Sequence, residues 1–135
     1  MRTNTAMTLY NKVIVGGVDT YRRTPIVAVA WENRKQANVL RSGLIAADSV
    51  SVYVPLSVCA NYVKPKAFLA LAVKTGKFTF SVGDYLVKGL VADEITTAFT
   101  ITGLKAAHDD VVQIKSVDTM DEGRANMRHF QLGAQ

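Results

Sequence analysis

The chain has 135 residues, 49% of them hydrophobic, and a formal net charge of +5. This length suits one domain with a sizeable core, and this hydrophobic content argues against a disordered chain. A single cysteine excludes an intrachain disulfide and a zinc site built from several thiolates. We therefore expect one domain over residues 1–135, with Cys59 as a buried, inert thiol in its apolar setting.

The charge is unevenly distributed along the chain. Residues 1–66 hold nine Lys/Arg and three acids, whereas residues 67–135 hold seven Lys/Arg and eight acids. The first part therefore suggests a basic face directed at an anionic partner, although lysines and arginines that only maintain solubility explain it equally well. The longest apolar run, Ala67–Val73, is far shorter than the ~20 residues that span a bilayer. With no secretory start before Asn11, we expect a soluble protein without a membrane partner.

The first half of the chain predicts three β-strands. In the third of these, Val50, Val52 and Val54 alternate with polar residues, which is typical of a strand with one buried face. Pro55 ends that strand because it cannot donate a backbone hydrogen bond. The predicted strands are Thr8–Val15, Thr24–Trp31 and Asp48–Pro55.

A long segment, residues 32–47, separates the second and third strands. Its sixteen residues exceed the usual connection in a compact domain, and connections of this length are usually functional or disordered. It carries Arg34, Lys35 and Arg41 and ends in the apolar run Gly43–Ala47. We expect a long loop whose apolar end packs on its own domain or on a neighbour.

The second half predicts more short strands and little helix. Phe78 and Phe80 share a face of one strand, which turns at Gly83-Asp84 into a second, Tyr85–Val91. Two later strands, Asp110–Asp118 and Asn126–Gly133, flank a turn-prone stretch. A short helix is expected from Pro65 to a cap at Gly76, with another turn or two around Leu104. The predicted fold is mainly β: a small barrel or sandwich of six or seven strands with one or two short helices.

The sequence offers no recognisable catalytic or metal-binding motif. His108 and His129 have no partner at metal-ligand spacing, and neither a nucleophile elbow nor a phosphate loop occurs. His108 precedes Asp109-Asp110, which could orient an imidazole, but a solvated turn is the simpler interpretation. Adjacent acids in a strand point to opposite faces and cannot share a proton. We expect no enzyme, no metal and no cofactor.

A second hypothesis is a basic β-barrel that binds single-stranded nucleic acid. Such a protein needs exposed aromatic side chains on which bases stack. The aromatic candidates are embedded in apolar alternation and are typical of core residues; they are Tyr53, Phe78, Phe80 and Tyr85. Tyr21 beside Arg22-Arg23 is the best basic and aromatic cluster, and one cluster is weak support.

The order of the segments "TLYNKVI", "DTYRRTPIVAVAWEN", "SGLIAADSVSVYVP" and "GKFTFSVGDYLVKG" resembles that of small neck proteins of long-tailed bacteriophages. The resemblance covers residues 8 to about 118 and is to head-completion, or stopper, proteins. It implies a homo-oligomeric ring between the portal-adaptor and the tail, assembled in the bacterial cytoplasm and retained in the virion neck. It also implies that the loop of residues 32–47 projects into the DNA channel of the ring. Arg34, Lys35 and Arg41 would then face packaged double-stranded DNA, which they contact without reading its sequence, or pair with acidic residues of the adjacent ring.

The resemblance further implies interfaces with ring neighbours or tail proteins. We assign these interfaces to two groups, Tyr21, Arg22 and Arg23 near the start and Met127, His129 and Phe130 near the end. The C-terminal segment 126–135 either adds a strand to a partner sheet or completes its own barrel, and the second is slightly favoured. A tail terminator that caps the tail tube is the closest rival function, but it would carry more helix beside its sheet.

Overall fold

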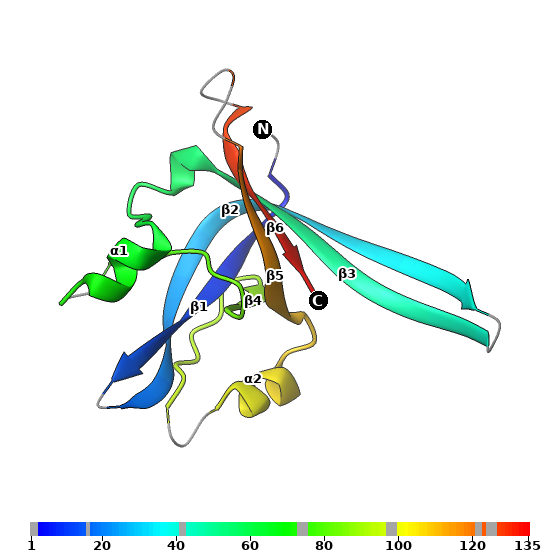
Figure 1. Cartoon of the computed structure of the whole chain (residues 1–135), viewed down its shortest axis with the longest axis horizontal. Helices are drawn as coiled ribbons and strands as arrows, with labels where there is room; N and C mark the ends of the chain where they lie inside the picture. Colours follow the sequence, from blue (N-terminus) through cyan, green and yellow to red (C-terminus); the bar gives the residue numbers. More distant parts are fainter. Residues whose placement is uncertain are drawn as a thin grey trace.

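The structure is a computed structural model that describes residues 3–15, 17–40, 43–72, 76–96, 100–120, 123 and 127–135, with side chains described for these residues except 15, 33–40 and 43–48. Six strands close a barrel in the order β1-β2-β3-β6-β5-β4 (Figure 1). Every neighbouring pair is antiparallel. The strands are β1 (Thr5–Val15), β2 (Val18–Leu40), β3 (Gly43–Pro55), β4 (Tyr85–Lys88), β5 (Val111–Met120) and β6 (His129–Ala134). The prediction of a mainly β barrel is confirmed.

Alternating burial explains why these segments are strands. In β3, Val50, Val52 and Val54 all point into the core, on the face that the sequence predicted. In β6 the same alternation buries Phe130 and Leu132. Because side chains of a strand alternate between its two faces, each of these strands gives one apolar row to the barrel interior. The rows meet in a single core that also includes Met7, Leu9, Ile26, Val29, Trp31, Phe78, Phe80, Leu86 and Ile114.

The strand β2 is long enough to serve two neighbours in succession. It pairs with β1 from Val18 to Val29, and it pairs with β3 from Ala30 to Leu40. The structure therefore corrects the loop expected at residues 32–47. That segment projects, but it consists of the ends of β2 and β3 paired as a hairpin, and only residues 41–42 at its turn lie outside the described part.

Two short helices and a 3₁₀ turn lie outside the barrel strands. The helix α1 (Pro65–Ala70) begins with proline, as predicted, but its C-cap is Leu71 and it does not reach the cap expected at Gly76. The helix α2 (Ile101–Ala107) has Thr100 as its N-cap. The Thr100 hydroxyl accepts a hydrogen bond from the amide of Gly103 at 3.4 Å. The turn η1 (Leu56–Val58) follows β3 directly. No helix in the described ranges is long and apolar enough to cross a membrane.

An aromatic cluster fills the end of the barrel near η1. Phe78 and Phe80 are buried, as predicted, but they form no strand: Phe78 makes only an isolated bridge with Tyr62. The rings of Tyr62 and Phe130 lie 4.5 Å apart, and those of Phe80 and Phe130 lie 5.1 Å apart, between their centroids. Ring packing against Tyr62, two backbone hydrogen bonds of Phe78 and the Asn11 side chain at Thr79 therefore hold residues 78–80 in place of a continuous strand ladder.

The C-terminal strand completes the protein's own barrel. Residues 129–134 of β6 pair with β3 on one side and with β5 on the other, so this segment has no free edge to add to a partner sheet. The alternative in which these residues add a strand to a partner sheet is therefore wrong. The interface role predicted for Phe130 is wrong as well, because its side chain is 3% exposed and lies within the aromatic cluster.

We expect Phe130→Ala to lower the free energy of unfolding by about 3–5 kcal/mol, because it removes a buried ring from a packed cluster. Urea unfolding followed by tryptophan fluorescence measures this change. Met127→Ala is the matched control: Met127 is three residues away and 60% exposed, so its loss should cost less than about 0.5 kcal/mol. Equal effects of the two substitutions would contradict the assignment of Phe130 to the core.

Candidate functional site

The hairpin formed by residues 32–47 is the most prominent feature of the molecule, and we call it the arm. Its two strands leave the barrel together and extend well beyond it, on the side away from α1 (Figure 1). In the described chain, β1 pairs with β2 no further than Val29, and β6 pairs with β3 only from Val50 onward. The strand segment from residue 33 to 40 therefore pairs with β3 alone. At about 3.4 Å per residue, its eight residues reach roughly 27 Å beyond the barrel.

The base of the arm is fixed to the barrel by Asn4 and Trp31. The backbone amide of Asn4 donates to the carbonyl of Val29 at 2.9 Å. Its side chain donates to the carbonyl of Trp31 at 3.1 Å and accepts from the Trp31 amide at 3.0 Å. Asn4 thus serves as a hydrogen-bond partner of β2 at the point where the strand changes neighbours. The Trp31 side chain is 4% exposed and packs in the core, so the arm starts from a rigid support.

The basic residues predicted for the DNA channel fall on the arm. Arg34 and Lys35 lie in β2, where the register pairs them with Ser49 and Asp48. Their side chains, and the whole of Arg41, lie outside the described part of the chain. The sequence gives residues 32–47 three basic residues and one acid, Glu32, so the arm carries net positive charge.

The first predicted interface group lies on β2 beside α2. The rings of Tyr21 and Tyr85 meet edge to face with centroids 5.6 Å apart. Tyr21 also lines an open groove of about 570 Å³ between β2 and α2. Arg23 donates from Nε to Glu94 at 2.7 Å and from Nη1 to the carbonyl of Val91 at 3.3 Å. Arg23 therefore links the segment after β4 to β2. The Arg22 side chain is half-buried.

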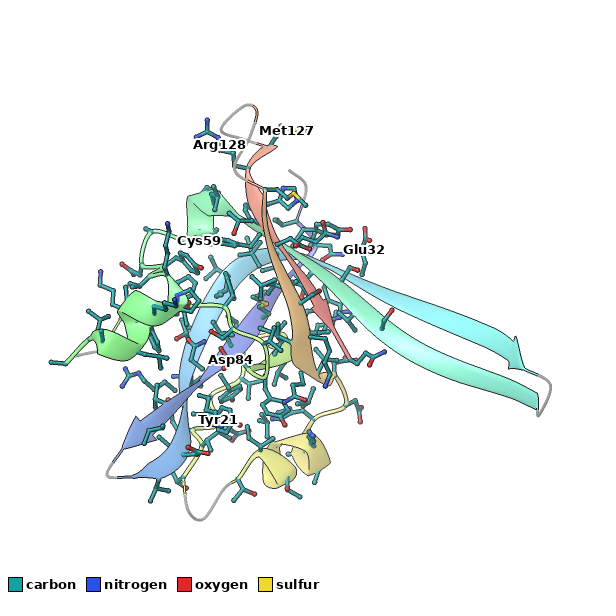
Figure 2. The ribbon with its side chains drawn as sticks, in the orientation of Figure 1. Tyr21, Glu32, Cys59, Asp84, Met127 and Arg128 are labelled. Carbon is teal, nitrogen blue, oxygen red and sulfur yellow. The ribbon has the colours of Figure 1, made fainter. Side chains whose placement is uncertain are left out.

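The second predicted group lies at the other end of the barrel, and Figure 2 shows Met127 and Tyr21 far apart. The Met127 side chain is exposed. His129 Nδ1 lies 2.9 Å from the carbonyl of Met127, and the imidazole packs edge to face against Tyr53 with centroids 5.6 Å apart. The structure therefore does not bring the two predicted groups into one surface.

A buried polar cluster around Asp84 escaped the sequence analysis. The Asp84 carboxylate accepts from Asn11 Nδ2 at 2.7 Å and from the backbone amide of Lys12 at 3.0 Å. Asn11 also donates to the carbonyl of Thr79 at 2.6 Å. Burial raises the pKa of Asp84 above its ordinary value, although these hydrogen bonds to the ionised form oppose the shift. The cluster ties β1 to the turn before β4, and Figure 2 shows Asp84 within the body of the barrel.

Other titratable groups also have structural partners. His108 Nε2 lies 2.8 Å from Asp93 Oδ2, so its partner is Asp93 and not the acids that follow it in the sequence. The Tyr10 hydroxyl donates to the carbonyl of Asp93 at 2.7 Å, and burial raises its pKa to about 12. Burial also raises the pKa of Cys59 to about 11, which supports the prediction of a buried, unreactive thiol. Within the described ranges, no three His, Cys, Asp or Glu side chains are grouped so as to hold a metal ion.

The chain belongs to a family of unknown function, DUF6751, which matches residues 2–135. No curated protein and no solved structure matches the chain. The family therefore spans both the barrel and the arm, and the proposal for function depends on their geometry.

We expect Asn4→Ala to lower the free energy of unfolding by about 1–3 kcal/mol, because it leaves the amide and carbonyl of Trp31 without this partner at a buried position. Amide hydrogen exchange should accelerate most at the base of the arm, around Trp31 and Glu32. Asn61→Ala, an exposed asparagine elsewhere, is the control. Acceleration spread evenly over the barrel would show that Asn4 has no specific role at the arm.

We expect Asp84→Asn to flatten the dependence of stability on pH. Burial raises the pKa of Asp84 in the folded state above its ordinary value of 3.8, so the folded protein holds this proton more tightly than the unfolded chain. The resulting stabilisation is complete below pH 3.8 and is lost as the pH rises through the folded-state pKa. Urea unfolding from about pH 4 to 7 should show this decline in the wild type and a smaller one in the variant. Identical slopes would contradict the raised pKa.

Proposed function

We propose that the protein is a structural component of a bacteriophage neck, of the head-completion type, which forms a ring between the portal-adaptor and the tail. The observation that carries this proposal is the arm, a rigidly based hairpin projecting roughly 27 Å from a small closed barrel. A ring of such barrels would hold its arms at fixed positions around a central channel.

The composition of the arm supports contact with packaged DNA. Arg34, Lys35 and Arg41 give it positive charge, and lysine and arginine neutralise phosphates without reading base sequence. A hairpin suits this role better than a loose loop, because the backbone hydrogen bonds between its strands hold it extended. In this proposal the base at Trp31 stays fixed, and a swing of the part of the arm beyond it closes the channel after packaging and opens it at ejection.

Two features weigh against the rival functions. The helices α1 and α2 have only six and seven residues, less helix than a tail terminator is expected to carry beside its sheet. A barrel that binds single-stranded nucleic acid needs exposed aromatic rings for stacking, yet Phe78 and Phe80 are buried in the core and Tyr53 and Tyr85 are half-buried. The terminator is therefore an alternative outcome of the test, and a protein that binds single-stranded nucleic acid is the next hypothesis if the particles are normal.

The test is deletion of this reading frame from a phage that carries it, followed by electron microscopy of the lysate. We expect tails of normal length beside heads that are empty or leaking DNA. Full heads beside overlong tails would favour a terminator, and normal infectious particles would overturn the neck assignment.

Complementation then tests the arm itself. A chain with Arg34→Gln, Lys35→Gln and Arg41→Gln should restore the attachment of tails but not the retention of DNA, because only the charge of the arm has changed. The matched control replaces three basic residues outside the arm, with Lys105→Gln, Lys115→Gln and Arg128→Gln, and should restore both.

A further inference from the structure

An apolar groove opens on the α1 side of the barrel. It has a volume of about 250 Å³ and lies between the end of β1, α1 and the turn before β4. Three aliphatic side chains on its walls are unusually exposed: Ile14 at 70%, Leu69 at 64% and Val82 at 66%. Leaving three such side chains in water is unfavourable, and a group of them around one hollow marks a contact surface.

Basic residues lie beside this groove, at the start of α1. Residues 49–83 contain four lysines and no acid. Lys64 and Lys66 flank the start of α1, and Lys66 is one helical turn before Leu69, so the two residues share a face of the helix. In the described chain, Lys64 and Lys66 have no ion-pair partner. The two charged groups within the groove are already satisfied, since Lys12 pairs with Asp19 at 3.3 Å and Asp84 accepts from Asn11. The free lysines at the rim therefore favour an acidic partner.

The same chain carries the complementary surface beside α2. Asp109 and Asp110 are exposed in the short connection between α2 and β5. The carbonyl of Asp110 accepts from the amide of Lys88 at the end of β4. Two residues further along, Leu90 is 62% exposed. This corner thus presents an exposed leucine with two carboxylates close by, and we call it the α2 corner.

We propose that the α2 corner of one copy docks in the groove beside α1 of the next copy, with Leu90 among Ile14, Leu69 and Val82 and with Asp109 and Asp110 at the lysines of the rim. The apolar contact supplies the affinity, and the opposite charges fix the orientation.

The positions of the two surfaces favour a closed assembly. In Figure 1, α1 and α2 lie on different sides of the barrel, so the contact joins unlike surfaces, head to tail. A head-to-tail contact repeats with a fixed rotation and closes into a ring where that rotation allows. The arm leaves the barrel on the side away from α1 (Figure 1). The inference rests on the ring of the proposed function and names the surfaces that build it.

Disulfide trapping of the purified full-length chain tests the contact. Leu69→Cys and Leu90→Cys are combined in one chain and oxidised under mild conditions at about pH 8, where an exposed thiol is reactive. The native Cys59 does not interfere, because it is buried and its pKa is raised to about 11. We expect a ladder of linked dimers, trimers and higher species. Either cysteine alone should give at most dimers.

The control chain pairs Leu69→Cys with Met120→Cys, an exposed position at the end of β5 that is not part of the α2 corner. A ladder at least several times stronger in the test chain than in the control supports the proposal. Equal ladders, or none, overturn it. If light scattering then shows that the wild-type chain is oligomeric, the ring remains and its contacts lie elsewhere, so the proposed function stands.

Charge reversal adds a second test in the same double-cysteine chain. Lys64→Glu with Lys66→Glu should reduce the ladder several-fold, because like charges now face one another. Adding Asp109→Lys and Asp110→Lys should restore it. No loss on reversal, or no recovery on the double exchange, would contradict the placement of the acids at the lysine rim.

Discussion

The change of partner in the middle of β2 is the constraint on which the rest of the structure depends. Up to Val29 the strand belongs with β1, and from Ala30 it belongs with β3, so one continuous backbone joins the two parts of the barrel wall. Such a transfer interrupts the regular ladder, and buried backbone groups need partners wherever a ladder is interrupted. Asn4 provides them at Trp31. Closure of the barrel and the direction of the arm both follow from this junction.

The sequence predicted those parts of the fold that depend on local alternation. Val50, Val52 and Val54 identified β3 and its buried face, and Pro65 identified the start of α1. The arm was expected as a loop because residues 32–41 are mostly polar or charged and have weak β propensity. They form a strand because β3 lies beside them, and pairing of this kind is not visible in either segment alone.

Contacts between residues far apart in the sequence could not be predicted either. Gly83-Asp84 was interpreted as a turn, and Asp84 does follow one, but its partner Asn11 lies 73 residues earlier within an apolar strand. Phe78 and Phe80 alternate as in a strand, yet ring packing against Tyr62 replaces the ladder. The sequence could not show which of two predicted interface residues, Phe130 or Met127, is buried. That depends on the pairing of β6 with a strand on each side.

The arm also affects how the chain behaves at high protein concentration. In the described structure, the outer edges of its two strands carry backbone donors and acceptors without a neighbouring strand. Open edges of this kind recruit other strands and can seed fibrous aggregates, and charged residues on an edge are a common protection against this. Arg34 and Lys35 place such charge near the barrel, and we expect repulsion between arms to keep free chains apart. Between residues 36 and 47 the sequence is largely apolar or uncharged, and Arg41 is its one charged residue, so this protection is weaker there. We therefore expect free chains to associate through their arms above a limiting concentration.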